Sequence, residues 1–154
     1  QVVVLGTGEE RFQHDFSWFA QKYPSQMCAN IGYSEDKAHR IYAGADMFLM
    51  PSQFEPCGLS QLISMRYGTV PIVRETGGLK DNVEPYNEIW QTGTGFGFRN
   101  YDAGEMLFII RYALKIYQEQ PKAWKAMMKR CMKHDSSWQT VTKKYEAIYE
   151  KITS

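Results

Sequence analysis

The stretch MFLMPSQFEPCGLSQLISMRYGTVPIV, residues 47–73, contains two short apolar runs separated by a loop and a helical segment. Residues 47–50 and 70–73 have the length and apolar content of buried strands. A helix between two such strands is typical of a parallel pair joined by a crossover connection. The stretch therefore predicts a strand–helix–strand unit of a parallel sheet.

The same alternation of apolar runs and helical segments continues along most of the 154 residues. The expected strands lie at residues 2–5, 27–31, 47–50, 70–73 and 95–98, and three helices without an intervening strand follow. In the helix after the third strand, Leu59, Leu62 and Ile63 form an apolar stripe that we expect to face the sheet. We predict an α/β fold in one domain over residues 1–154, a Rossmann-like doubly wound parallel sheet with C-terminal helices.

Charge and hydropathy exclude two classes of partner. Lysine and arginine number 18 and aspartate and glutamate 17, so the net charge is +1, and no long run of one charge is present to bind a nucleic acid. The longest apolar runs, residues 2–5 and 47–50, are far shorter than the roughly 20 residues that span a bilayer. We therefore expect neither a nucleic-acid partner nor a membrane.

The cysteines, histidines and aspartates do not form a recognisable metal or disulfide pattern. Cys28, Cys57 and Cys131 are an odd number at wide spacing. The sequence has no Asp-x-Asp pair and no cysteine or histidine pair at ligand spacing. We therefore expect no metal and no cofactor, and a reducing compartment, the cytoplasm, as the location.

The loop after residues 47–50 is the most informative for function, because ligands of a doubly wound sheet bind at the carboxyl ends of its strands. Pro56 is suited to a helix start, which would leave the N–H groups of residues 57–60 free to hold phosphate or sugar oxygens. The Glu55 carboxylate beside them could accept hydrogen bonds from sugar hydroxyls. Alternatively, Glu55 is only a capping residue that compensates the helix dipole.

Two further loops follow predicted strands. In Thr76-Gly77-Gly78, the adjacent glycines permit either a nest of backbone N–H groups that binds an anion or a plain turn. Tyr33, at the end of the second strand, could stack on a purine ring or be an ordinary aromatic residue at the rim of the sheet. Anion-capable loops on the third and fourth strands would allow one phosphorylated ligand to contact both.

Four segments carry motifs of one known family: IGY at 31–33, HRIYAGAD at 39–46, PSQFEPCGLSQ at 51–61 and TGGL at 76–79. In these motifs the chain resembles the bacterial glycogen synthase and plant starch synthase family, over about residues 1–152. The resemblance implies the C-terminal, donor-binding half of a GT-B glycosyltransferase, in which two Rossmann-like domains face each other across a cleft. It also implies the transfer of glucose, with retention, from ADP-glucose to the non-reducing end of an α-1,4-glucan.

The same resemblance implies roles for single residues. Glu55 would be the catalytic-site residue that contacts the transferred glucose, and Tyr33 would stack on the adenine of ADP. The other substrate-binding residues would hold glucose and phosphate through N–H groups or hydroxyls: Cys57, Gly58, Leu59, Ser60, Thr76, Gly77 and Gly78. The family's chemistry is metal-independent, which agrees with the lack of a metal motif.

Two departures limit what the resemblance assigns. Ile63 stands where many related retaining transferases carry a second glutamate, so the residue that binds the ribose is unassigned. The chain begins at Gln1 and enters an apolar run at once, so we expect it to be a piece of a longer protein. The first strand of the domain, the basic residues for the diphosphate and the N-terminal domain that binds the α-glucan acceptor would then lie outside it.

Two alternative functions remain open from the sequence. One is another transferase of the same architecture that uses a UDP-sugar or makes sucrose, which the run Phe54-Glu55-Pro56-Cys57 disfavours. The other is a non-catalytic nucleotide-binding α/β domain of flavodoxin-like shape. A binding scan with ADP, UDP and FMN would distinguish the three functions.

Overall fold

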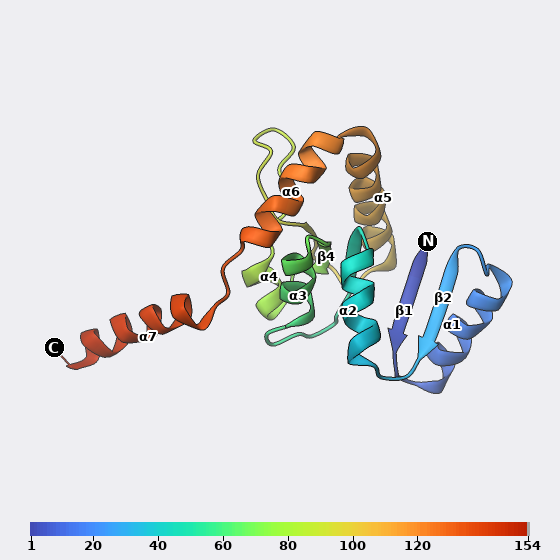
Figure 1. Ribbon diagram of the computed structural model, residues 1–154, viewed down its shortest axis with the longest axis horizontal. Coiled ribbons are helices and arrows are strands. Elements are labelled where there is room, and N and C mark those ends of the chain that lie inside the picture. Colours follow the sequence, from blue (N-terminus) through green and yellow to red (C-terminus); the bar gives the residue numbers. More distant parts are fainter. Residues whose placement is uncertain (154) are drawn as a thin grey trace. The chain divides into compact units, whose positions relative to one another are not determined.

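The computed structural model describes residues 1–153 and divides into two compact units, Gln1–Ala45 and the chain from Asp46 onward. All five expected strands are present, with ends within one residue of those expected, and the alternation of strands and helices is confirmed. The elements, most of them labelled in Figure 1, are β1 (Val2–Gly6), α1 (Glu10–Lys22), β2 (Met27–Ile31), α2 (Glu35–Gly44), β3 (Met47–Met50), α3 (Ser60–Tyr67), β4 (Val70–Arg74), α4 (Gly77–Asn82), β5 (Phe96–Phe98), α5 (Ala103–Glu119), α6 (Pro121–Lys133) and α7 (Trp138–Thr153).

The first unit contains a two-stranded parallel sheet with helices α1 and α2. Strand β1 pairs with β2 from Val2 opposite Met27 to Gly6 opposite Ile31. Helix α2 begins after Ser34, whose hydroxyl accepts a hydrogen bond from the N–H of Lys37 at 3.3 Å. None of residues 1–45, all of which the structure describes, is fully buried.

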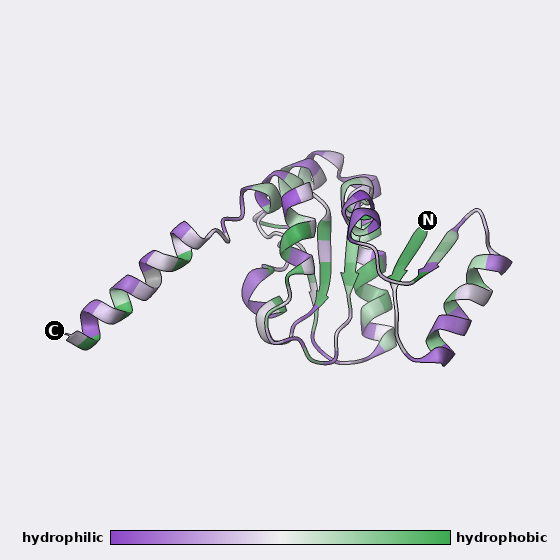
Figure 2. Ribbon diagram, turned by 60° about the horizontal axis from the view of Figure 1, so that its bottom comes forward, coloured by the Kyte–Doolittle hydropathy of each residue, from purple (hydrophilic) through white to green (hydrophobic). Residues whose placement is uncertain are grey.

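The second unit contains a three-stranded parallel sheet in the order β3–β4–β5. The central strand β4 is buried over residues 70–73, as expected for a strand with neighbours on both edges. Figure 2 shows the strands of this unit as green, hydrophobic ribbons with helices packed around them. The core side chains come from the sheet and from helices α3 to α6, and they include Met65, Ile72, Leu79, Phe96, Ile116, Trp124 and Met127.

Helix α3 presents only part of its expected apolar stripe to the core: Leu62 packs against the core, and Leu59 does not. The buried residues are Gln61, Ser64 and Met65, whereas Leu59 is 68% exposed. The expectation was wrong for Leu59 and did not include the two buried polar side chains, which find hydrogen-bond acceptors in the chain itself: the Ser64 hydroxyl donates to the Gln61 carbonyl at 2.8 Å, and Gln61 bonds to the preceding loop. The Gln61 Oε1 atom is buried without a hydrogen-bond partner in residues 1–153, so the burial of this amide is only partly compensated.

No helix within residues 1–153 combines the length and the apolar content that crossing a bilayer requires.

Candidate functional site in the loops after β3 and β4

The two loops expected to share a ligand are bonded to each other. The loop 51–59 follows β3, and the segment 75–78 follows the neighbouring strand β4. The N–H of Gly78 lies 3.2 Å from the Glu55 carbonyl oxygen and 3.3 Å from that of Pro56. The parallel pairing of the strands therefore brings both loops to one end of the sheet.

Gly77 and Gly78 are glycines because the two backbones approach closely. A Cβ atom at Gly77 would lie 2.0 Å from the Glu55 carbonyl oxygen, and a Cβ at Gly78 would lie 2.1 Å from that of Cys57. Gly77 also has a φ of 44°, in the left-handed region that glycine tolerates best. The contact between the loops therefore excludes any side chain at either position.

Donors from β4, α3 and α4 bind most of the carbonyl oxygens of the loop 51–59. At one end, Arg74 donates from Nε to the Ser52 oxygen at 2.9 Å and from a terminal nitrogen to the Gln53 oxygen. At the other end, the buried Gln61 amide donates to the oxygens of Cys57, at 3.2 Å, and Gly58, at 2.5 Å. Together with Gly78, these donors hold the loop by its carbonyls.

The N–H groups of Cys57, Gly58 and Leu59 are left as potential donors to a ligand. Within residues 1–153 they meet no hydrogen-bond acceptor. Cys57 and Leu59 are exposed, so a ligand in solution can reach both ends of this segment, whereas Gly58 between them is buried. Such a row of amides suits phosphate or hydroxyl oxygens.

The Glu55 side chain is half-buried, and its carboxylate makes no hydrogen bond or ion pair with the part of the chain that the structure describes. The interpretation of Glu55 as a cap of α3 is not supported, because α3 begins at Ser60 and its N-cap Leu59 makes no side-chain cap bond. Pro56 was also expected at the helix start and is not there. Gly58, with a φ of 71°, turns the chain before the helix begins.

The remaining predicted residues lie at the ends of helices and strands. Ser60 is the first residue of α3, and Thr76 is the N-cap of α4; neither hydroxyl has a bond to any of residues 1–153. Tyr33 is 89% exposed and lies between β2 and α2, in the first unit. The structure therefore brings Glu55, Cys57–Ser60 and Thr76–Gly78 together within the second unit, and Tyr33 belongs to the first.

Sequence reasoning missed two residues that shape the site, Gln61 and Arg74. A polar residue on the buried face of a helix and a cation at the end of an apolar strand are the signals that could have identified them. No cluster of histidine, cysteine, aspartate or glutamate that could hold a metal ion is found among the described residues.

The three thiols differ in accessibility, which predicts a simple reactivity pattern. Cys131 is buried, its Sγ lies 2.9 Å from the Thr94 carbonyl oxygen, and burial raises its pKa to about 12, whereas Cys28 and Cys57 are exposed. Because the thiolate is the reactive form, we expect a thiol reagent at neutral pH to modify Cys28 and Cys57 and to spare Cys131. Mass spectrometry of the alkylated native protein, with a denatured sample as control, measures this; modification of Cys131 before unfolding would contradict it.

Comparison with known proteins places this chain in a family. The family model for glycosyl transferases group 1 matches residues 1–130. A glycogen synthase from Lachnoclostridium phytofermentans is 57% identical over 152 residues, which are 99% of this chain and 32% of that protein. The catalytic domain of starch synthase IV from Arabidopsis thaliana, solved with bound ADP and acarbose, has a TM-score of 0.86 and 34% identity over 98% of this chain and 32% of that one.

A sucrose-phosphate synthase from Thermosynechococcus elongatus shares the fold, with a TM-score of 0.67 at 18% identity over 99% of this chain and 38% of that one. The chain spans about a third of the length of the relatives that it matches. The expected resemblance to glycogen and starch synthases and the Rossmann-like fold are confirmed. The chain belongs to the glycosyl transferases group 1 family.

Proposed function

We propose that this chain is the donor-binding part of a retaining glycosyltransferase that moves glucose from ADP-glucose to the non-reducing end of an α-1,4-glucan. The observation that carries the proposal is the Glu55 carboxylate, which has no partner among residues 1–153 and stands two residues before a row of three unpaired backbone N–H groups. A carboxylate accepts hydrogen bonds from sugar hydroxyls, and amides donate to phosphate oxygens. The glycogen and starch synthases among the relatives support the same substrate.

In this proposal the loop binds both the glucose and the diphosphate of the donor, on either side of the glycosidic bond that breaks. The N–H groups of Cys57, Gly58 and Leu59 bind glucose and phosphate oxygens, and the hydroxyls of Ser60 and Thr76, which cap no helix, add to the phosphate contacts. Charge grows on the leaving diphosphate as the glycosidic bond breaks, so donors fixed before the reaction stabilise the transition state. Glu55 orients the glucose by accepting hydrogen bonds from the sugar hydroxyls.

Tyr33 is proposed to stack on the adenine. Replacing it with alanine should weaken ADP binding by up to about tenfold, because aromatic stacking contributes about 0.5–1.5 kcal/mol. Titration calorimetry of the full-length protein measures the effect, with Trp90→Ala, an exposed aromatic in the loop before β5, as control. An unchanged dissociation constant for ADP in Tyr33→Ala would place Tyr33 outside the base site.

The site that binds the acceptor glucan and the basic residues that neutralise the diphosphate are proposed to belong to a part of the protein outside these 154 residues. The chain's coverage of about a third of its relatives supports this proposal. The cytoplasm is the proposed location, in keeping with the three free thiols.

The 154-residue chain made alone should therefore fold and show no glucan synthesis. The buried core of the second unit supports folding, whereas transfer needs donor and acceptor held together, which can supply about 7–11 kcal/mol of the barrier. A melting curve and the incorporation of radiolabelled glucose from ADP-glucose into glycogen measure both properties. Full activity of the chain alone would refute the proposal that the acceptor site lies outside it.

The same assay tests the proposed function itself when the full-length protein is used. Incorporation from ADP-glucose is expected, and incorporation from UDP-glucose alone would favour a UDP-sugar transferase. Binding of ADP, UDP or FMN without any transfer would favour a non-catalytic nucleotide-binding domain.

A further inference from the structure

Arg74, the last residue of β4, uses each of its three guanidinium nitrogens for a different backbone carbonyl. Nε donates to Ser52 at 2.9 Å, one terminal nitrogen donates to Arg99 at 3.0 Å, and the other donates to Gln53. Two of these carbonyls belong to the loop that leads to Glu55, and the third belongs to the segment between β5 and α5. Arg74 thus ties the loop after β3 to the residues after β5.

The guanidinium is suited to this task and a smaller cation is not. Its planar fork directs several N–H groups at fixed angles, and hydrogen bonds from a charged donor are stronger than neutral ones. Its carbon also lies 5.9 Å from the centre of the Tyr101 ring, within the range of a cation–π contact. Within residues 1–153 it has no carboxylate partner, so its charge is directed entirely to the backbone and this ring.

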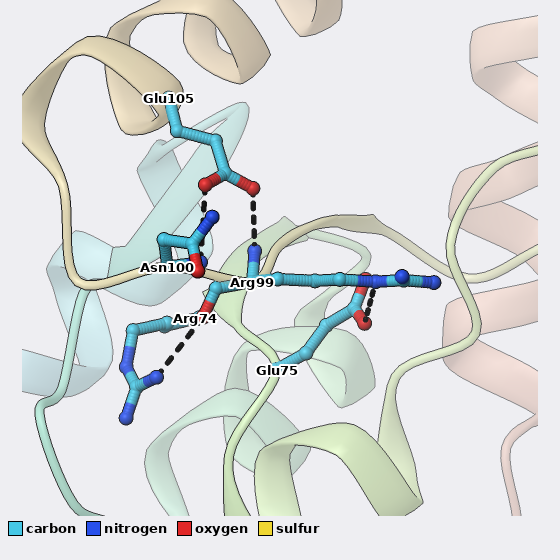
Figure 3. A network of polar contacts seen from close by, with 5 residues as sticks. All are labelled: Arg74, Glu75, Arg99, Asn100 and Glu105. Atoms are coloured by element: carbon cyan, nitrogen blue, oxygen red, sulfur yellow. Dashed lines mark hydrogen bonds and ion pairs between the residues drawn. The ribbon is translucent and has the colours of Figure 1, made fainter.

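The third carbonyl is itself fixed by helix α5, as Figure 3 shows. The Glu105 carboxylate accepts from the N–H of Arg99 at 2.8 Å and from that of Asn100 at 3.0 Å. The N–H of Glu105 in turn donates to the Asp102 side chain at 2.8 Å, which caps the helix. These backbone bonds lower the pKa of Glu105, so the link is intact at neutral pH and weakens only in acid, when the carboxylate is protonated.

A second contact joins the same segments. The Arg99 side chain lies 3.6 Å from the Glu75 carboxylate, beside the segment that carries Thr76 and the two glycines. Residues 99 and 100 are therefore held both by α5 and by the end of β4. They provide Arg74 with a fixed point from which to hold the loop.

We propose that Arg74 is a positioning residue for glucosyl transfer: it fixes the backbone at Ser52 and Gln53, and through it the place of Glu55, by anchoring the loop to the capped start of α5. This inference rests on the proposed function. Gln61 holds the other end of the loop independently, at the carbonyls of Cys57 and Gly58, so the amides at 57–59 keep their places when Arg74 is changed. The Glu55 carbonyl itself accepts from the Gly78 N–H, so without Arg74 this residue is held from one side only. Loss of Arg74 should therefore affect turnover more than ADP binding.

The test uses the full-length protein with Arg74→Ala and Arg74→Lys. A shift of about 1 Å in a group near the reaction can lower the rate by about 100-fold, which is the loss of kcat expected for Arg74→Ala. The dissociation constant for ADP should change far less. Arg74→Lys, with one nitrogen in place of three, should stay closer to Arg74→Ala than to the wild type.

Arg66→Ala is the matched control, because Arg66 also donates to a backbone carbonyl, that of Met132 at 2.9 Å, but outside the two loops. Guanidinium ion at a non-denaturing concentration should restore part of the kcat of Arg74→Ala, and sodium chloride at the same ionic strength should not. A purely structural role of Arg74 would lower the melting temperature without such a rescue.

The outcomes separate the two proposals. A wild-type protein without transfer from ADP-glucose refutes the proposed function, and with it the role of Arg74. If the wild type is active and the Arg74 variants have the same kcat as Arg66→Ala, only the role of Arg74 is refuted and the proposed function stands. If Arg74→Ala does not fold, Arg74→Lys decides: wild-type kcat overturns the inference, and a large loss of kcat with ADP binding retained supports it.

Discussion

Replacing Glu55 with alanine in the full-length protein is expected to lower kcat by about 100-fold or more, with little change in the affinity for ADP. The carboxylate is half-buried and has no partner in residues 1–153, so its removal leaves no other protein group unpaired. Its contacts would go to the glucose, whose position changes in the transition state, and losing one preorganised contact of this kind costs about 10²–10³ in rate. The nucleotide would keep its own contacts.

Steady-state kinetics with ADP-glucose and glycogen, together with calorimetry for ADP, separate the two effects. Glu119→Ala, which removes an exposed carboxylate at the end of α5, is the control and should leave both values unchanged. If Glu55 only stabilised the fold, Glu55→Ala would lose about 0.5–2 kcal/mol of stability, as for a lost cap, and keep its activity per folded molecule. Normal kcat would remove Glu55 from the catalytic site.

Gly78→Ala is the second change expected to have a large effect. The new Cβ would lie 2.1 Å from the Cys57 carbonyl oxygen, so the loops after β3 and β4 would have to separate. The hydrogen bonds from the Gly78 N–H to Glu55 and Pro56 would be strained at the same time. We expect a loss of about 1–3 kcal/mol in the free energy of unfolding, the usual cost of overpacking, and a large loss of ADP binding.

Gly44→Ala provides the control for this substitution. Gly44 is the last residue of α2, and a Cβ there would meet nothing within 4 Å. Alanine at this site should be neutral or stabilising by up to about 1 kcal/mol. Chemical denaturation of both variants measures the difference, and equal stability of Gly78→Ala and Gly44→Ala would contradict the close approach of the loops.

The strands and the end of the sheet at which the two loops meet were predictable because they depend on local patterns. Runs such as 47–50 and 70–73 are apolar over the length of a strand, and the order of parallel strands places the following loops at one end of the sheet. The glycines at 77 and 78 indicated an unusual backbone. The close approach that requires them was not predicted, because it depends on a segment about 20 residues earlier in the chain.

The roles of Gln61 and Arg74 were not predictable for the same reason. Arg74 bonds to carbonyls at Ser52, Gln53 and Arg99, which only the fold brings within reach. The apolar stripe predicted the packing of Leu62 but not the exposure of Leu59 or the burial of Gln61, whose amide bonds to the preceding loop.

The lack of a fully buried residue in Gln1–Ala45 has a consequence for the dynamics of the chain. Free energies of local opening follow the amount of buried apolar surface, so the backbone amides of β1 and β2 should exchange with solvent through smaller, more frequent openings than those of β4. Tyr33 is part of this less stable unit. A nucleotide that binds Tyr33 only when this unit is folded would make the openings rarer as the nucleotide concentration rises. The nucleotide would thereby stabilise the folded state of this unit.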